Sequence, residues 1–123
     1  MTPHQTATAA YAPDAAPLRS ARGTEFEIFA RVTRRLTSAA KDGAFPALAA
    51  ALHDNRRLWT ALAADLADEG NALPPGLRAQ LFYLAEFTMA HSARVLSGEA
   101  TAEALVDINT SVMKGLAGPG AAA

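Results

Sequence analysis

The chain has 123 residues, a formal net charge of −1 and no cysteine. This length predicts one domain whose hydrophobic core is large enough to be stable without a bound metal or a disulfide. The charge argues against a protein that binds nucleic acid over its whole surface, and the lack of cysteine excludes disulfides, a thiol nucleophile and cysteine–zinc sites.

The composition predicts an all-α protein, because alanine, leucine and arginine favour helices and alternating β-branched runs are missing. No apolar run reaches the length of about 18 residues that a transmembrane helix needs. The first 17 residues lack the basic and apolar segments of a secretory signal. We therefore expect a cytoplasmic protein.

Residues 1–17 contain three of the seven prolines and predict a flexible arm. The alternative is a short helix that Tyr11 anchors to the body. The first main helix is expected from Leu18 or Ser20 to Ala40, before the helix-ending Lys41-Asp42-Gly43. Its inward face is predicted to carry Ile28, Phe29, Val32, Leu36 and Ala39.

The central helix is expected from Phe45 or Pro46 to Asp68, with Gly70 as the natural residue just past its end. One stripe at 100° per residue carries its predicted core positions. They are Phe45, Leu48, Leu52, Asn55, Trp59, Leu62 and Leu66.

The fourth segment of the chain predicts a helix from Pro74 to Ser97, followed by Gly98. Its inward stripe is Leu77, Leu81, Leu84, Thr88, His91 and Val95, and a second apolar stripe carries Phe82, Met89 and Leu96. A last helix is expected from Thr101 to Lys114, with Leu105, Ile108, Asn109, Val112 and Leu116 inward. Residues 117–123 are expected to be a disordered tail.

Four amphipathic segments with short connections predict a small antiparallel bundle of four main helices over residues 18–116. Trp59 and three polar residues, Asn55, His91 and Asn109, fall on predicted core faces. We interpret all four as structural core, with the polar groups hydrogen-bonded to neighbouring helices.

A metal-binding or general-base role for His91 is the alternative, but no second histidine or carboxylate stands at ligand spacing. The candidate nucleophiles Ser38, Ser92 and Thr110 have no base at a recognisable spacing, and no phosphate-binding loop occurs. We expect no enzymatic activity, no cofactor, no metal and no small-molecule substrate.

Two spaced strings around the central turn are the most specific feature of the sequence. They read N-x-x-L-W-x-x-L-x-x-D-L-A from Asn55 and N-x-L-P-x-x-L-R-A from Asn71. They continue to His91, Val95, Leu96 and Gly98, and then to Leu105-Val106-Asp107-Ile108-Asn109 and Met113-x-Gly115-Leu116. Their order and spacing from about Gly23 to Leu116 resemble the flagellar biosynthesis regulator FlaF.

The resemblance implies a small helical cytoplasmic protein of flagellum biogenesis and bacterial motility. Such proteins support flagellin production and handling before export, alongside an opposing regulator, FlbT. The leading hypothesis is a chaperone that holds a flagellin helix in an apolar groove. Our candidate partner-binding residues are Phe82, Met89, Leu96 and Met113.

The alternative is a regulator of flagellin expression that acts on mRNA or on an FlbT-like protein. Arg31, Arg34 and Arg35 could contact RNA phosphates. No aromatic side chain is interleaved with them and no RNA-binding motif is present, so a solvated helix face is the expected interpretation.

Overall fold

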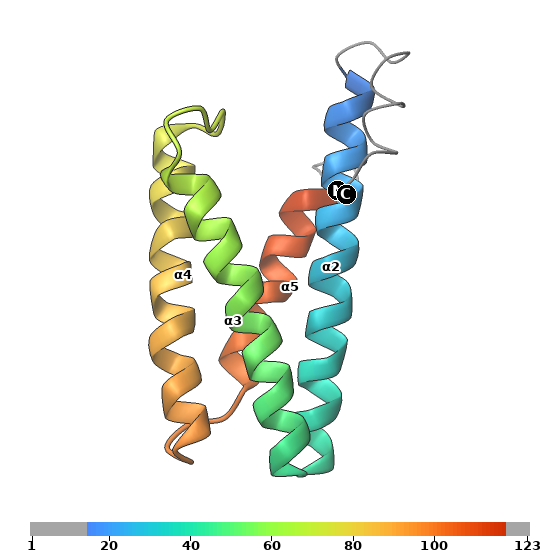
Figure 1. Cartoon of the computed structure of the whole chain (residues 1–123), viewed down its shortest axis with the longest axis vertical. Coiled ribbons are helices and arrows are strands. Elements are labelled where there is room, and N and C mark those ends of the chain that lie inside the picture. Colours follow the sequence, from blue (N-terminus) through green and yellow to red (C-terminus); the bar gives the residue numbers. More distant parts are fainter. Residues whose placement is uncertain (1–14, 118–123) are drawn as a thin grey trace.

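The computed structural model describes residues 15–117, and the surroundings of side chains from residue 25 to residue 115. Four helices follow one another: α2 (Ala15–Asp42), α3 (Phe45–Ala67), α4 (Pro75–Leu96) and α5 (Glu103–Ala117). Successive helices run in opposite directions (Figure 1). The predicted all-α antiparallel bundle is therefore confirmed.

The helix boundaries lie within three residues of those predicted, counting the first helix from Leu18. α2 begins earlier, at Ala15, and Pro17 falls in its first turn, where no backbone N–H needs a partner. Predictions about Tyr11 and the rest of the arm, and about the tail after Ala117, concern parts of the chain outside the described residues.

Two glycines in the left-handed region end helices as predicted. Gly43 has a φ of 74° in the turn between α2 and α3, and Gly98 has a φ of 82° after α4. At the second site the N–H of Gly98 donates to Val95 O and the N–H of Glu99 donates to Arg94 O. These two bonds make the Schellman arrangement that closes a helix C-terminus.

The core consists of two apolar clusters stacked along the bundle. One contains Leu36, Ala39, Ala51, Leu52, Val95, Ala102 and Leu105. The other contains Phe29, Trp59 and Ala85, with several half-buried residues packed against it. On every helix, a buried polar residue lies close to the boundary between the parts that contribute to the two clusters. These residues are Thr33, Asn55, Thr88, Ser92 and Asn109, which we call the polar layer.

Two predicted core residues are exposed. Phe45 is 57% exposed and Leu77 is 41% exposed. Both lie in the first turn of a helix, where the neighbouring helices no longer cover them. The helical wheel correctly placed both residues on the inward side of their helices. A wheel does not show where the neighbouring helices end, so it could not predict that these residues are exposed.

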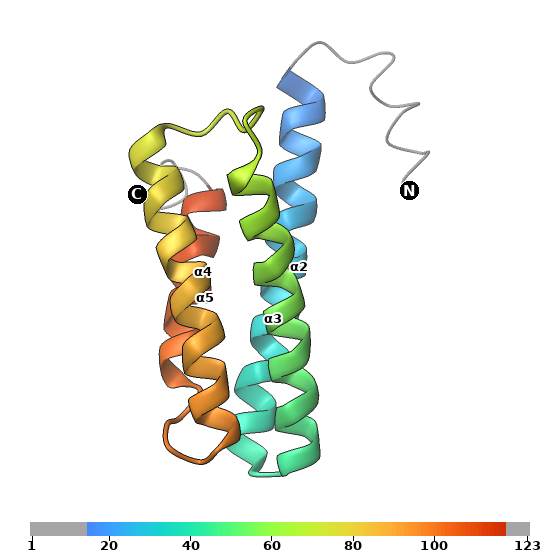
Figure 2. The same cartoon turned by 60° about the vertical axis from the view of Figure 1, so that its left-hand side comes forward.

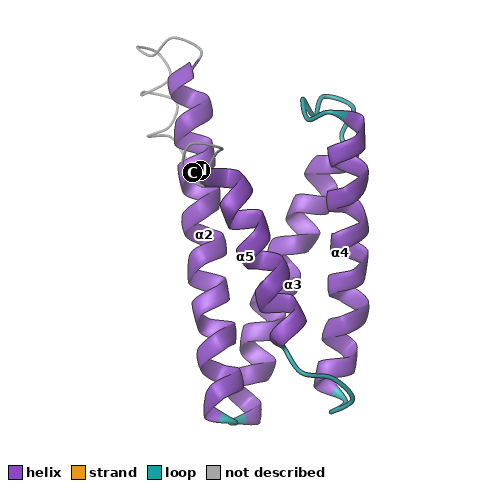
Figure 3. Ribbon diagram, turned by 180° about the vertical axis from the view of Figure 1, so that it is seen from behind, coloured by secondary structure: helices purple, strands orange, loops and turns teal. Residues whose placement is uncertain are grey.

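The fourth side of the bundle is the least closely packed. α5 packs mainly on α2, and its contact with α4 is the smallest among the neighbouring pairs. Figures 1 and 3 show α5 inclined from the lower end of α4 toward α2 at its C-terminal end. The N-terminal half of α4 is consequently packed mainly on α3, and Figure 2 shows these two helices side by side.

Trp59 is the largest fully buried side chain, and its ring meets Phe29 edge-to-face with centroids 5.8 Å apart. We expect Trp59→Ala to lower the free energy of unfolding by about 3–5 kcal/mol through lost burial and a residual cavity. Denaturant titration followed by circular dichroism measures this change. A midpoint equal to that of the wild type would contradict the assignment of Trp59 to the core.

Candidate functional site

The polar layer is centred on the side-chain amide of Asn109. Its Nδ2 donates to Asn55 Oδ1 at 2.8 Å and to Thr33 Oγ1 at 3.1 Å, and its Oδ1 accepts from Trp59 Nε1 at 2.9 Å. The Thr33 hydroxyl then donates to Phe29 O at 2.6 Å. One amide therefore connects α2, α3 and α5.

The partners of Asn109 also fix the orientation of its amide. An indole N–H can only donate, so the atom that faces Trp59 must be the oxygen. The two amide hydrogens then point to acceptors on two different helices. The predicted placement of Asn55, Trp59 and Asn109 in the core is correct, and Thr33 is a member of the cluster that the sequence analysis missed.

The side chains bonded around Asn109 have the properties expected of a structural role. All four side chains are buried, and none of them is ionisable. It offers no exposed nucleophile and no charged group for acid–base chemistry. Among the described residues, no three His, Cys, Asp or Glu side chains gather where they could hold a metal ion.

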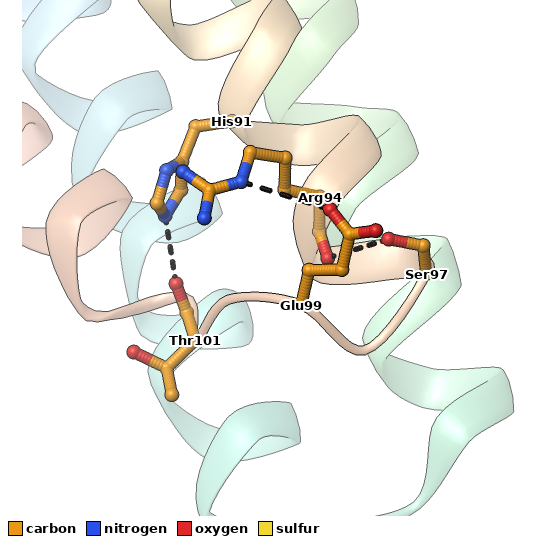
Figure 4. A network of polar contacts seen from close by, with 5 residues as sticks. All are labelled: His91, Arg94, Ser97, Glu99 and Thr101. Carbon is orange, nitrogen blue, oxygen red and sulfur yellow. Dashed lines mark hydrogen bonds and ion pairs between the residues drawn. The ribbon is translucent and has the colours of Figure 1, made fainter.

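His91 is half-buried, in contrast to the fully enclosed core histidine that the sequence predicted. Its Nε2 lies 2.9 Å from Thr101 O and donates a hydrogen bond, since a carbonyl can only accept (Figure 4). Its ring stacks on Phe87, with centroids 5.1 Å apart. His91 thus attaches the start of α5 to α4.

The neighbouring turn is held mainly by backbone groups. Arg94 O accepts the N–H groups of Glu99 and Ala100, and the Ser97 hydroxyl donates to the same oxygen. The Arg94–Glu99 ion pair is long, at 3.9 Å, and both side chains are exposed (Figure 4). Such a pair contributes little to stability.

The turn between α3 and α4 is built by Arg78 and Asn71. Arg78 donates to Leu66 O from both Nε and a terminal nitrogen, and to Asp68 O as well. Asn71 donates to Asp65 O and accepts from the N–H of Leu73. Side chains therefore satisfy the free carbonyls at the end of α3.

This capping corrects the prediction for Gly70. The C-cap residue is Asp68, with an extended backbone, and Gly70 does not occupy the left-handed position after the helix. Its N–H donates to Asp68 Oδ1 at 3.0 Å. Because Arg78 and Asn71 satisfy the carbonyls, the chain needs no left-handed residue there.

The four predicted partner-binding residues do not form one accessible surface. Met89 and Met113 pack against the cluster around Trp59, and Leu96 packs against the other cluster. Phe82 alone remains substantially exposed, at 38%. Of these four residues, the structure leaves mainly Phe82 accessible, and partner binding at them stays a prediction.

Helical spacing explains which neighbours cover these residues. Phe82, Met89 and Leu96 continue the flank of α4 that begins at Arg78, and Arg78 is bonded to the end of α3. That stripe consequently faces α3. Met113 faces α2 instead, where it lines a shallow hollow beside Thr33.

The opposite flank of α4 faces α5. His91 on this flank binds Thr101 at the start of α5. Leu84 and Leu77 precede His91 by two and four turns and therefore lie on the same flank. The ring of Phe87 stacks on His91, and Tyr83 precedes Phe87 by one turn.

The facing side of α5 carries apolar residues as well. Ala104, Ile108 and Val112 are half-buried and lie on the side of Asn109 opposite to Met113, and so toward α4. We call the apolar residues of these two flanks together the α4–α5 face. They are Leu77, Tyr83, Leu84, Phe87, Ala104, Ile108 and Val112.

The α4–α5 face combines an apolar character with incomplete cover. Leu77 is 41% exposed and Tyr83 is 65% exposed. Farther along α5, Gly115 lies two turns after Ile108 on the same flank, and a Cβ atom there would meet no other atom within 4 Å. Space for an additional side chain therefore exists beside this face.

Comparison with known families gives one match. The family model described as flagellar protein FlaF matches residues 7–116. No curated protein and no solved structure matches the chain. Within residues 15–117, no helix combines the length and apolar character needed to cross a membrane.

The central role of Asn109 can be tested by removing its amide. Asn109→Leu leaves Trp59 Nε1, Asn55 Oδ1 and Thr33 Oγ1 buried without this partner, and an unsatisfied buried polar group costs about 1–3 kcal/mol. We expect a loss of about 3 kcal/mol or more in chemical denaturation. Thr110→Ala, which removes a hydroxyl bonded at the surface, is the matched control and should change stability by less than about 0.5 kcal/mol. Equal stability of the two variants would show that the polar layer is dispensable.

The cap on α3 gives a second test. Arg78→Lys keeps the charge but removes the planar fork that reaches two carbonyl groups, and should cost about 1–2 kcal/mol. Arg94→Lys alters the long, exposed ion pair and should be close to neutral. Thermal melts of both variants measure the difference. A destabilised Arg94→Lys beside a native-like Arg78→Lys would reverse our assignment of the two arginines.

Proposed function

The chain belongs to the FlaF family of flagellar proteins, and from this premise we propose that it is a cytoplasmic chaperone that binds flagellin before export. The proposed binding site is the α4–α5 face, where one amphipathic helix of flagellin docks. No catalytic step is part of this function.

The observation that carries the proposal is the incomplete cover of the α4–α5 face. Apolar residues lie on the facing flanks of α4 and α5 and are only partly buried. Figure 3 shows α5 diverging from the N-terminal half of α4. An incoming helix with apolar residues at positions i, i+3, i+4 and i+7 would complete the packing there. Each large apolar side chain fully removed from water contributes about 1.5–3 kcal/mol, so several partly exposed ones suffice for specific binding.

The type of interaction also separates this proposal from its main alternative. Apolar docking is weakly sensitive to salt, whereas RNA binding through Arg31, Arg34 or Arg35 weakens steeply as salt rises. The alternative role, control of flagellin expression through mRNA or an FlbT-like protein, therefore predicts a different salt response. Flagellin capture measured with and without RNase, over a salt series, distinguishes the two.

The docking face is tested by adding charge at its two most exposed positions. Leu77→Glu combined with Tyr83→Glu should leave helicity intact and weaken flagellin binding at least about tenfold, because a buried carboxylate must be desolvated. Phe26→Glu combined with Phe45→Glu is the matched control, since both residues are exposed and lie on other helices. Circular dichroism and flagellin co-purification are measured on the same preparations.

Two results would contradict the proposed site. The first is full flagellin capture by a folded Leu77→Glu/Tyr83→Glu variant. The second is an equal loss of capture in the control pair. A third variant, Gly115→Leu, tests the site by filling it: a leucine in place of a helical glycine stabilises the helix, yet it should block the incoming segment.

A further inference from the structure

We propose that the polar layer holds one internal water molecule, which joins the Asn55 amide on α3 to the Thr88 hydroxyl on α4. Two fully buried polar atoms, Asn55 Nδ2 and Thr88 Oγ1, have no hydrogen-bond partner among the described residues. Buried polar groups of folded proteins are nearly always hydrogen-bonded, either to protein atoms or to ordered water. The inference concerns the interior of the bundle and does not depend on flagellin binding.

The Asn55 amide cannot satisfy its nitrogen by turning over. Trp59 Nε1 can only donate, so Asn109 Oδ1 faces the indole and the Asn109 N–H groups point elsewhere. One of them donates to Asn55 at 2.8 Å, so the Asn55 atom that faces Asn109 must be the oxygen. Asn55 Nδ2 is the other branch of the same planar group. Its two buried N–H groups therefore still need an acceptor.

The Thr88 hydroxyl differs from other hydroxyls on the helices of this protein. Four of them donate to the carbonyl oxygen four residues earlier, those of Thr33, Thr37, Ser92 and Thr110. This local bond is a common way to satisfy a threonine or serine inside a helix. Thr88 Oγ1 does not form it, although its side chain is fully buried. The Thr88 hydroxyl therefore needs a partner outside its own helix.

The two unpartnered atoms belong to the same level of two neighbouring helices. α3 and α4 run antiparallel and lie side by side (Figure 2). On each helix the polar residue is flanked along the chain by one buried residue of each apolar cluster; these are Leu52, Trp59, Ala85 and Val95. Asn55 and Thr88 are both fully enclosed at this level. One small molecule between the two helices can therefore bind both.

A water molecule has the donors and acceptors that this position requires. Its oxygen accepts one hydrogen from Asn55 Nδ2 and another from the Thr88 hydroxyl. Ser92 Oγ can accept a hydrogen of the water, because the Ser92 hydroxyl donates its own hydrogen to Thr88 O at 2.6 Å. Ser92 is fully buried and follows Thr88 by one turn of α4. The water thus forms about three hydrogen bonds, the usual number for an internal water.

The surroundings of this position favour a neutral occupant over an ion. All five side chains of the polar layer are uncharged. A cation would be repelled by the N–H hydrogens of Asn55, and an anion would lie in the interior without a compensating charge. An apolar group there would leave Asn55 Nδ2 and Thr88 Oγ1 unsatisfied. Water is the small neutral molecule that satisfies both.

The water extends the polar layer to the fourth helix. The bonds of the Asn109 amide connect α2, α3 and α5, and none of them reaches α4. Asn55 accepts from Asn109, and the water joins Asn55 to Thr88, so α4 becomes part of the same network. The contact between α4 and α5 is the smallest among the neighbouring pairs. The water therefore adds a directional link to the side of the bundle where packing is weakest.

A high-resolution crystal structure of the full chain tests the site directly. We expect electron density for one water oxygen at about 2.7–3.2 Å from both Asn55 Nδ2 and Thr88 Oγ1. Thr88→Ser keeps the hydroxyl and should keep this density. Thr88→Val replaces the hydroxyl by a methyl group of similar size and should lower the occupancy of the water. The first measurement uses the wild-type chain and so does not depend on the folding of a variant.

The stability of Thr88→Val gives a second readout, whose sign separates a hydrated site from a dry one. With the water present, valine removes one of its partners, so the equilibrium constant for unfolding should rise at least about fivefold. In a dry interior, valine would replace an unsatisfied hydroxyl, and the variant would be as stable as the wild type or more stable. Chemical denaturation followed by circular dichroism measures the constant. Thr37→Val is the matched control: it removes an exposed hydroxyl bonded within its own helix and should change the constant less than about twofold.

Three results would overturn the proposal. The first is a wild-type structure without a water between the two atoms, whether Asn55 Nδ2 contacts Thr88 Oγ1 directly or the Thr88 hydroxyl turns to Leu84 O. The second is a Thr88→Val variant at least as stable as the wild type. The third is full occupancy of the water in Thr88→Val, which would show that the Thr88 hydroxyl does not hold it.

Discussion

The hydrogen bonds of the Asn109 amide are the constraint on which the arrangement of helices depends. Apolar packing alone tolerates a shift of one helix along another, because leucine, valine and alanine contacts are non-directional. The Asn109 amide must form hydrogen bonds with a hydroxyl on α2 and with an amide oxygen and an indole N–H on α3, and a shift of the helices would break these bonds. A shift by one turn, about 5.4 Å, would bury all these groups against apolar side chains. The polar layer thus fixes the register of three helices, at some cost in stability.

Most of the helical architecture could be predicted from the sequence, because it rests on local signals. Gly43 and Gly98 end helices, and Trp59, Asn55 and Asn109 lie on clear apolar stripes. Thr33 was missed because a threonine at the flank of an arginine-rich helix gives no sign of burial. Its spacing of four residues from the buried Phe29 was the only available signal.

The errors arise where the outcome depends on the position of a neighbouring helix. A wheel showed that Met89 and Leu96 form a second apolar stripe, but it could not show that α3 covers it. Leu77 is exposed, contrary to the prediction, because α5 inclines toward α2 and does not cover it. The angle between two helices cannot be predicted from a local sequence pattern. The hydrogen bonds from Arg78 to Leu66 and Asp68 could not be predicted from the sequence either, because they join residues on two sides of a turn.

Many residues that carry the family resemblance hold the fold together. Asn71 and Arg78 close the turn between α3 and α4, His91 attaches the start of α5, and Trp59 binds Asn109. The residues of the proposed α4–α5 face are different ones. The residues that hold the helices together are therefore separate from those proposed to bind flagellin.

The position of Trp59 has an additional consequence for the optical properties of the chain. It is the single tryptophan of the sequence, it is fully buried, and its indole N–H is bonded to a side chain on another helix. Its emission therefore responds to solvent entry and to loss of the bond with Asn109, both of which accompany separation of α3 from α5. The protein carries a built-in fluorophore at the junction of its helices, and the cooperativity of the whole bundle can be followed without a label.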